Sequence, residues 1–236
     1  MTNSEIIDLM VEDLKKSAAF KHNTLGVPGF TTNMKRLGVS SPQIKKIVND
    51  WSKVLYDFSA QQWIGLCIEL AGKEIFEAQV LSYELLWKNK RALAKLNQTQ
   101  ILELGNMLDN WVSVDSYSTM IAGWHWREGT LPDSQILEWL KSGNHWLRRV
   151  AVVCTVSLNL RSKGGTGDTK RTLMVCEKVI DDRNDLIVKA LSWALRELSK
   201  NDKPAVEDFL VKYQDRLHSR VVREVNAKLE TGRKNG

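Results

Sequence analysis

A tryptophan and an aspartate lie four positions apart in the stretch NWVSVDSY, residues 110–117. Four residues make about one helical turn, so Trp111 and Asp115 would share one face near the start of a helix. A fixed carboxylate stabilises a developing positive charge, and an indole face attracts cations by about 0.5–2 kcal/mol. The pair therefore predicts a site that favours a cationic group. The structural alternative is that Asp115 is a helix cap, the commonest role of an aspartate near a helix start.

Polar residues recur at similar positions in three further apolar segments, which read IFEAQVLSYELL (75–86), WLRRVAVVCTVS (146–157) and LIVKALSWALRE (186–197). Together with Asp115 they give steps of 36, 34 and 40 residues (79 to 115, 115 to 149 and 149 to 189), close to the spacing of two-helix repeats. Equivalent positions of successive repeats line one concave surface in a solenoid. The predicted row consists of Gln79, Asp115, Arg149, Lys189 and, from the basic segment 219–229, Arg220. A set of ordinary solvated helix turns would show the same periodicity.

The elements that must position these residues are helices. Apolar residues recur mainly at spacings of three and four, and no strand-like alternation is sustained. We place helix starts at Ser41 (followed by Pro42), Ser59, Thr99 and Asp133, and a loop at 162–171. About twelve short helical segments joined by short loops predict an all-α fold, a curved α-solenoid of about six helical pairs. We expect a single domain over residues 1–236, with a flexible tail at 232–236.

Composition narrows the functional classes. Hydrophobic residues make up 43% of the chain, enough for a substantial core, and only 14 glycines and 4 prolines interrupt it. No apolar run is long enough to cross a bilayer, and the start lacks a signal peptide, so we expect an intracellular, cytoplasmic protein. The formal net charge of +6 suits a polyanionic partner, although ordinary surface charge would also explain it. The cysteines Cys67, Cys154 and Cys176 are scattered, which indicates neither a disulfide framework nor a zinc site.

Three motifs resemble those of the DNA alkylation repair enzymes, the AlkD-like DNA glycosylases built from HEAT-like repeats. They are NWVSVDS around Asp115, NHWLRRVAVV (144–153) and KALSWALRELSK (189–200), in the order of that family. A fourth stretch, RLGVSSPQIKKIVNDW (36–51), resembles the N-terminal Leu-Gly segment of the family. The resemblance spans about residues 34 to 200 and implies that the helical pairs are HEAT-like.

The resemblance assigns roles to individual residues. Asp115 falls on the catalytic aspartate, Trp111 and Trp193 fall on the tryptophans that line the lesion site, and Arg149 and Arg196 fall on DNA-binding arginines. The sequence departs from the family where a tandem tryptophan becomes Asn110-Trp111 and the following acidic residue becomes Val112. A family tyrosine near the N-terminus becomes Asn33, for which Phe30 could substitute. These departures concern base stacking and the range of lesions more than the reaction.

The predicted activity is that of an alkylpurine DNA N-glycosylase, a hydrolase of base excision repair. It removes cationic N3- or N7-alkylated purines from double-stranded DNA and leaves an abasic site. An alkylated base leaves as a neutral molecule, so no general acid is needed, and neither a metal nor an organic cofactor is implied. Arg149, Lys189, Arg196 and Arg220 would contact phosphates and set the register of a monomer on DNA. The alternatives are a non-catalytic HEAT-repeat protein that binds branched or damaged DNA, and a protein-binding helical-repeat scaffold.

Overall fold

The computed structural model describes residues 1–18 and 30–234. These residues are helical apart from their connections, and the only extended pairing among them is an isolated bridge between Lys35 and Ile75. The prediction of an all-α fold is therefore confirmed. The chain forms two compact units, Met1–Ile121 and Ala122–Gly236, which we call unit 1 and unit 2. The boundary between them falls within a short π-helix, η1 (Ser118–Ala122).

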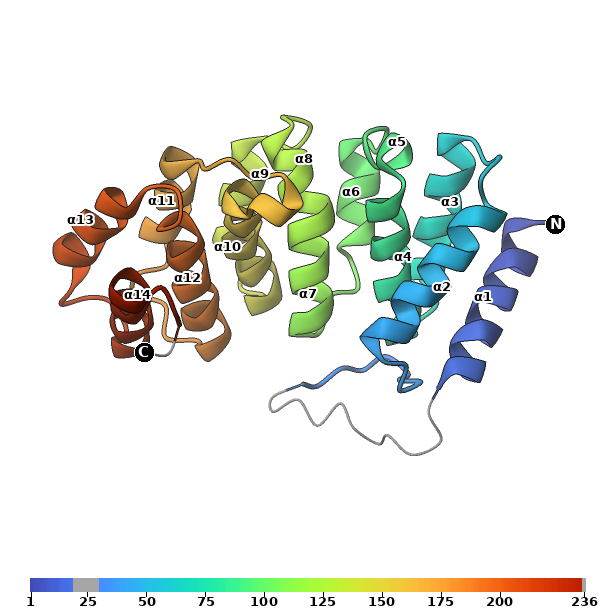
Figure 1. The fold of residues 1–236 in the computed structure, drawn as a ribbon, viewed down its shortest axis with the longest axis horizontal. Coiled ribbons are helices and arrows are strands. Elements are labelled where there is room, and N and C mark those ends of the chain that lie inside the picture. The colour runs from blue at the N-terminus through green and yellow to red at the C-terminus, as the bar shows by residue number, and fades with distance from the viewer. Residues whose placement is uncertain (19–29, 235–236) are drawn as a thin grey trace. The chain divides into compact units, whose positions relative to one another are not determined.

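Unit 1 contains two layers of helices (Figure 1). One layer consists of α2 (Ser41–Val54), α4 (Phe76–Lys88) and α7 (Trp111–Tyr117), in which α4 packs against both neighbours. The other layer consists of α1 (Asn3–Ser17), α3 (Ala60–Ala71) and α6 (Gln98–Leu104), with the single turn α5 (Lys90–Leu93) beside α3. Because each helix of one layer packs on a helix of the other, the apolar faces meet between the layers.

Unit 2 repeats this layered arrangement. In one layer α8 (Gly123–Arg127), α10 (His145–Asn159), α12 (Asp185–Leu198) and α14 (Ser219–Thr231) pack in sequence, and Figure 1 shows α12 between α10 and α14. The helices α9 (Asp133–Leu140), α11 (Thr169–Glu177) and α13 (Lys203–Tyr213) pack on this layer. A 3₁₀ turn, η2 (Arg161–Lys163), follows α10. We retain the single solenoid of about six pairs as a prediction for the whole chain.

Helix starts follow capping chemistry, with local differences from the prediction. Ser59 caps α3 as expected, and its side chain accepts a hydrogen bond from the Gln62 backbone N–H. The cap of α2 is Ser40 rather than Ser41, because Ser40 forms a capping box with Gln43. The cap of α6 is Asn97 rather than Thr99, for the same reason with Gln100. The predicted caps are therefore displaced by one or two residues, which is the usual uncertainty of a helix end, although α2 itself begins at Ser41 as predicted.

Two other sequence expectations need correction in part. The predicted loop at 162–171 is shorter, since Arg161–Lys163 form η2 and α11 begins at Thr169 after the cap Asp168. The helix start predicted at Asp133 is confirmed, since α9 begins there, but the cap is Pro132, and Asp133 accepts a hydrogen bond from Trp126 Nε1. The expected tail begins just after α14, and residues 235–236 of it lie outside the described residues.

The cores are apolar and include all three cysteines. Cys67, Cys154 and Cys176 are buried, and burial raises the pKa of the Cys67 and Cys176 thiols above the ordinary value. Thiols with raised pKa are poor nucleophiles, so Cys67 and Cys176 serve as small apolar core residues. Among the described residues, no helix combines the length and the apolar character that crossing a membrane requires.

Candidate functional site

The side chain of Asn110 fixes the first turn of α7. Its Oδ1 accepts a hydrogen bond from the Ser113 backbone N–H at 2.9 Å, and its Nδ2 donates to Ser113 Oγ at 3.1 Å. Asn110 is fully buried, so this cap is shielded from water. The helix therefore begins at Trp111. The structural alternative for Asp115 is wrong, because Asp115 lies one turn inside the helix and Asn110 is the cap.

Trp111 and Asp115 are half-buried residues of α7. Their separation of one turn places the two side chains on one face of the helix. The hydroxyl of Thr119 donates to the Asp115 main-chain carbonyl at 2.7 Å, and that of Ser118 donates to the Val114 carbonyl at 2.6 Å. These bonds anchor the junction between α7 and η1 immediately after the aspartate. Unit 1 thus presents an indole and a carboxylate together on a helix with both of its ends fixed.

Phe30 extends the aromatic surface beside Trp111. The ring centroids of Phe30 and Trp111 are 6.5 Å apart, with an edge-on interplanar angle of 86°. Phe30 also packs against Phe76 at 5.0 Å, and the Arg36 guanidinium lies 4.8 Å from the Phe30 ring centroid. Such edge-to-face pairs and cation–π contacts hold rings in defined orientations. The sequence comparison had raised Phe30 as a substitute for a missing tyrosine, and the structure places it beside Trp111.

Asp109 holds the segment after Phe30 against the start of α7. Its carboxylate accepts hydrogen bonds from Thr32 Oγ1 at 2.7 Å and from the Asn33 backbone N–H at 2.6 Å. The Asn110 amide donates to the same carboxylate at 3.0 Å. Asp109 therefore joins the N-terminal aromatic segment to the cap of the helix that bears Asp115. Sequence reasoning missed Asp109, because its partners Thr32 and Asn33 lie far away in the chain.

A second carboxylate, Glu77, holds the next part of the same segment. It is fully buried near the start of α4 and accepts hydrogen bonds from the backbone N–H groups of Leu37 (3.0 and 2.9 Å), Gly38 (2.7 Å) and Val39 (3.4 Å). Successive N–H groups that point at one anion form a nest. Gly38 has φ of +82°, a conformation that favours glycine. This geometry explains the Leu-Gly-Val stretch, whose chemistry the sequence alone did not show.

In unit 2, three of the predicted site residues share one stripe of α12. Lys189, Trp193 and Arg196 follow one another at spacings of four and three, so their side chains lie on one face. Trp193 is half-buried and Lys189 is exposed. The arrangement places an indole between two cations. Such a face can stack on a base and contact neighbouring phosphates.

Asp185 neutralises part of this basic surface. Its carboxylate pairs with Lys189 Nζ at 2.7 Å, one turn along α12, and with the Arg220 guanidinium from α14. The hydrogen bond from Lys189 lowers the pKa of the Asp185 carboxyl below its ordinary value of 3.8, and Arg220 adds to this effect. The carboxylate is therefore ionised at neutral pH. Two of the four predicted phosphate contacts already share an anion within the protein.

Arg196 is held in a polar network of its own. It is half-buried, and its Nε donates to Ser192 Oγ at 3.2 Å, whose hydroxyl donates to Glu224 on α14 at 2.6 Å. Burial lowers the pKa of the Arg196 guanidinium below its ordinary value, while Glu224 and Glu197 oppose this shift. An arginine remains charged under such a shift, so Arg196 adds a positioned cation to the α12 stripe.

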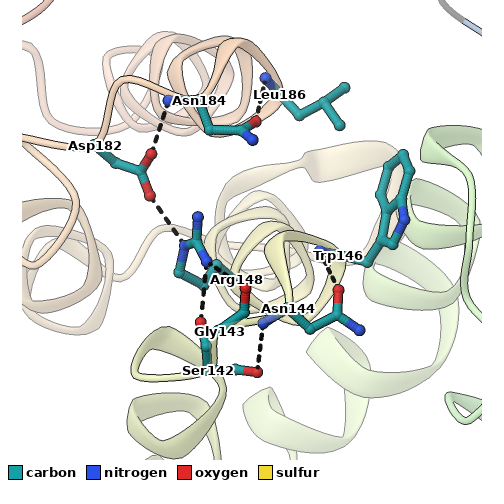
Figure 2. Close-up of polar contacts among 8 residues, drawn as sticks. All are labelled: Ser142, Gly143, Asn144, Trp146, Arg148, Asp182, Asn184 and Leu186. Carbon is teal, nitrogen blue, oxygen red and sulfur yellow. Dashed lines mark hydrogen bonds and ion pairs between the residues drawn. The ribbon is translucent and has the colours of Figure 1, made fainter.

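The two arginines of α10 bind the start of α12. Arg149 is 6% exposed and donates from its guanidinium to the Leu186 carbonyl. Figure 2 shows Arg148 between Asp182, to which it donates at 3.0 Å, and the carbonyls of the loop before α10. These contacts set the position of α12 relative to α10. The predicted DNA-binding residue Arg149 therefore lies in the interior of the protein, and its assignment as a phosphate contact stays a prediction.

Gln79, the first member of the predicted row, does not face solvent. It is 1% exposed on α4, and its Nε2 donates to the Met107 carbonyl in the loop before α7 at 3.4 Å. Its Oε1 has no hydrogen-bond partner in the described part of the chain. The expectation of a surface position for Gln79 is wrong, because α4 is packed by α2, α3 and α7.

With this geometry established, comparison with known proteins assigns the family. The family model described as "DNA alkylation repair enzyme" matches residues 12–229, nearly the whole chain. The chain belongs to the DNA alkylation repair enzyme family. No curated protein matches the chain. The family match confirms the resemblance seen in the four motifs, and it identifies a DNA repair protein with DNA as its substrate.

Within this DNA alkylation repair enzyme, the sequence identified the helices that carry the candidate residues but missed the side chains that position them. Trp111 and Asp115 are together on α7, and Lys189, Trp193 and Arg196 are together on α12. The missed residues are the carboxylates Asp109, Glu77 and Asp185. Only Asp185 had a readable signal, since it precedes Lys189 by four residues on the same helix.

Proposed function

We propose that the protein is a DNA glycosylase that hydrolyses the N-glycosidic bond of purines alkylated at N3 or N7 in duplex DNA. The observation that carries the proposal is the Trp111–Asp115 pair on one face of α7, inside the part of the chain that matches the family. The product is DNA with an abasic site. Family membership supports the DNA substrate, and the chemistry of the pair supports the reaction.

The proposed reaction depends on positive charge that moves from the base to the sugar. An N3- or N7-alkylated purine carries a formal positive charge, which weakens its bond to deoxyribose. When the bond breaks, the base leaves neutral with the bonding electrons and the sugar becomes an oxocarbenium-like cation. Asp115 stabilises this cation and orients the water that adds to it, as carboxylates do in glycosidases. The water adds to the sugar and loses a proton to the solvent, and the DNA is released with an abasic site.

Aromatic rings supply the second part of the proposed site. The indole of Trp111 faces the cationic nucleotide, and Phe30 and Asp109 hold the ring and its helix in place. By the family resemblance, Trp193 on α12 of unit 2 is a second candidate aromatic residue. Each ring contributes about 0.5–2 kcal/mol to binding a cation, depending on its desolvation. The site favours bases that are already charged.

Cations on α12 and α14 would hold the DNA backbone. Lys189 on α12 and Arg220 on α14 are exposed enough to reach phosphates, and Arg196 adds a second positive charge to the α12 stripe. Contacts to phosphates set register and carry little sequence information. We include Arg149 in the proposal. Experiment must distinguish a contact between Arg149 and DNA from a role in positioning α12.

The central experiment replaces Asp115 with asparagine and measures the release of 3-methyladenine and 7-methylguanine from alkylated duplex DNA. We expect Asp115→Asn to bind DNA normally and to release bases about 10²–10³-fold more slowly, the usual cost of removing one preorganised electrostatic group. Asp8→Asn, which changes an exposed aspartate of α1 in the same way, is the matched control and should keep the wild-type rate.

The alternative functions correspond to defined outcomes. Undiminished release by Asp115→Asn would remove Asp115 from the mechanism. Tight binding of damaged or branched DNA without any base release by the wild-type protein would favour a non-catalytic DNA-binding role. Failure to bind DNA at low salt would favour a protein-binding scaffold.

A further inference from the structure

A second basic site lies in unit 1, away from α7. An open cavity of about 420 Å³ is lined by the C-terminal end of α2, the start of α3 and the junction between α4 and α5. We call it the α3–α5 cavity. Its walls include Lys88, Lys90, Arg91, Tyr56, Ser59 and Trp63.

The charge of the cavity is of one sign. Lys88, Lys90 and Arg91 are all exposed side chains at its wall, and its lining contains no aspartate or glutamate. Lys90 lies over the ring of Trp87 in a cation–π contact. Lys88 and Arg91 form no salt bridge among the described residues. Three cations around one hollow without a carboxylate produce a local potential that attracts anions.

The start of α3 adds to this potential. Ser59 caps this twelve-residue helix and lines the cavity. The first N–H groups of a helix lack intrahelical acceptors, and the helix dipole is positive at that end. A helix N-terminus beside lysine and arginine side chains is a favourable place for a phosphate group.

Trp63 contributes an unsatisfied polar group to the same wall. Its side chain is 3% exposed and contributes to the cavity wall. Its indole Nε1–H is buried and has no hydrogen-bond acceptor in the described part of the chain. Buried donors normally have partners, and leaving one unsatisfied costs about 1–3 kcal/mol. A small movement of the neighbouring wall side chains on binding would be needed to open this donor to an acceptor.

An exposed aromatic ring stands at the same wall. Tyr56 is 84% exposed just after α2, although aromatic side chains usually bury most of their surface. Aromatic rings beside a basic groove stack on nucleic-acid bases, worth about 1–3 kcal/mol per base. The volume of the cavity exceeds that of a phosphate group alone and leaves room for the attached sugar.

The cavity is distinct from the proposed catalytic region. Lys88 ends α4, whereas Glu77, which anchors the segment after Phe30, lies at the start of the same helix. At 1.5 Å per residue, the two ends of α4 are roughly 18 Å apart. A ligand in the α3–α5 cavity would therefore not occupy the Trp111–Asp115 face.

We infer that the α3–α5 cavity binds a phosphodiester group of a DNA strand, with an adjoining base stacked on Tyr56. Lys88, Lys90 and Arg91 hold the phosphate at the start of α3. The choice of DNA follows from the family and from the positive charge. It is independent of the proposed glycosylase reaction, because it concerns undamaged DNA.

The first test compares two double variants on undamaged DNA. Lys88→Gln with Arg91→Gln removes two cations from the cavity, and Lys45→Gln with Lys46→Gln removes two exposed cations from α2 as the matched control. Fluorescence anisotropy at several salt concentrations measures affinity for a labelled duplex and for a single strand. The cavity variant should lower the magnitude of the salt slope by about 1.8 on the duplex or about 1.4 on the single strand, and the control should lower it less. Equal losses in both variants would overturn the inference.

The second test locates the strand. A single-stranded oligonucleotide that carries 5-iodouracil is irradiated with the wild-type protein, and cross-linked peptides are identified by mass spectrometry. We expect an adduct at Tyr56 that disappears in the Lys88→Gln, Arg91→Gln variant. Adducts confined to other parts of the chain, or none, would contradict the proposal. Binding of thymidine 5′-monophosphate as tightly as the oligonucleotide would assign the cavity to a free nucleotide and would equally overturn it.

Discussion

At the scale of single residues, two carboxylates position the segment that brings Phe30 to Trp111. Asp109 holds Thr32 and Asn33, and Glu77 holds the backbone of residues 37–39. Neither residue has a chemical role in the proposed reaction. Their partners are mostly backbone N–H groups 38 to 77 positions away. No sequence pattern encodes such contacts, so the sequence predicted the candidate pair but not what holds it.

Glu77→Gln should destabilise unit 1. The glutamine side chain keeps one acceptor oxygen. Its NH₂ group, however, would face backbone N–H groups that donate to the carboxylate in the wild-type protein. Hydrogen bonds to charged groups contribute about 1.5–3 kcal/mol, and we expect a loss of that size in the free energy of unfolding. Urea denaturation followed by circular dichroism measures it. Glu103→Gln makes the same change at an exposed position of α6 and should leave the midpoint unchanged. Equal midpoints for both variants would show that the nest contributes nothing.

Asp185→Asn should tighten the binding of undamaged DNA. The substitution releases Lys189 and Arg220, which share the Asp185 carboxylate, so both become available to phosphates. The salt slope measured by anisotropy should become steeper by up to about 1.8. Asp181→Asn, which releases Arg216 through the same change of charge, is the control. An equal gain in the control would attribute the effect to net charge rather than to the basic stripe.

At the scale of elements, α7 depends on a close approach to the end of α6. A Cβ at Gly105 would lie 2.9 Å from the Tyr117 ring and hydroxyl, and that hydroxyl donates to the Ile101 carbonyl at 2.7 Å. A similar contact joins α4 to α6, because the Tyr83 hydroxyl donates to the Leu104 carbonyl. The ring centroids of Tyr83 and Tyr117 are 5.8 Å apart. The absence of a side chain at Gly105 thus sets where α7 lies against α6.

Gly105→Ala should therefore lower the stability of the protein and slow base release together. Overpacking of this kind costs about 1–3 kcal/mol, and the displaced Tyr117 would shift the helix that carries Asp115. Thermal melting and the base-release assay measure the two effects. Gly143→Ala adds the same methyl group where no heavy atom lies within 4 Å and should change neither. A loss of stability without any loss of rate would show that the position of α7 tolerates the change.

Helix content was predictable from the sequence, while some helix ends were not. The apolar spacing predicted helices at α7, α10 and α12, and the structure has them. The capping boxes at Ser40 and Asn97 are readable in the sequence as Ser-x-x-Gln and Asn-x-x-Gln. The predicted caps are instead the nearby Ser41 and Thr99. The burial of Gln79 and Arg149 could not be read from periodicity, because burial depends on which helices pack against each position.

At the scale of the whole molecule, the proposed reaction restricts the substrates. A site that stabilises a cationic sugar but has no proton donor for the departing base should act only on bases that leave as neutral molecules. We expect release of 3-methyladenine and 7-methylguanine and no release of uracil or hypoxanthine. Duplexes with each lesion and chromatography of the freed bases provide the measurement. Efficient release of uracil would show that the protein activates neutral bases and that the proposed mechanism is wrong.

The carboxylate shared by Lys189 and Arg220 has a kinetic consequence. In the proposed complex with DNA, these two cations would exchange the Asp185 carboxylate for a phosphate, and Asp185 would take its place again when the phosphate departs. Neither step leaves a bare cation, so the barrier to moving from one phosphate to the next is low. A repair protein must inspect many intact nucleotides for each damaged one. We expect Asp185 to shorten the residence time of the protein on intact DNA. The search for damage then becomes faster, while the affinity for intact DNA becomes lower.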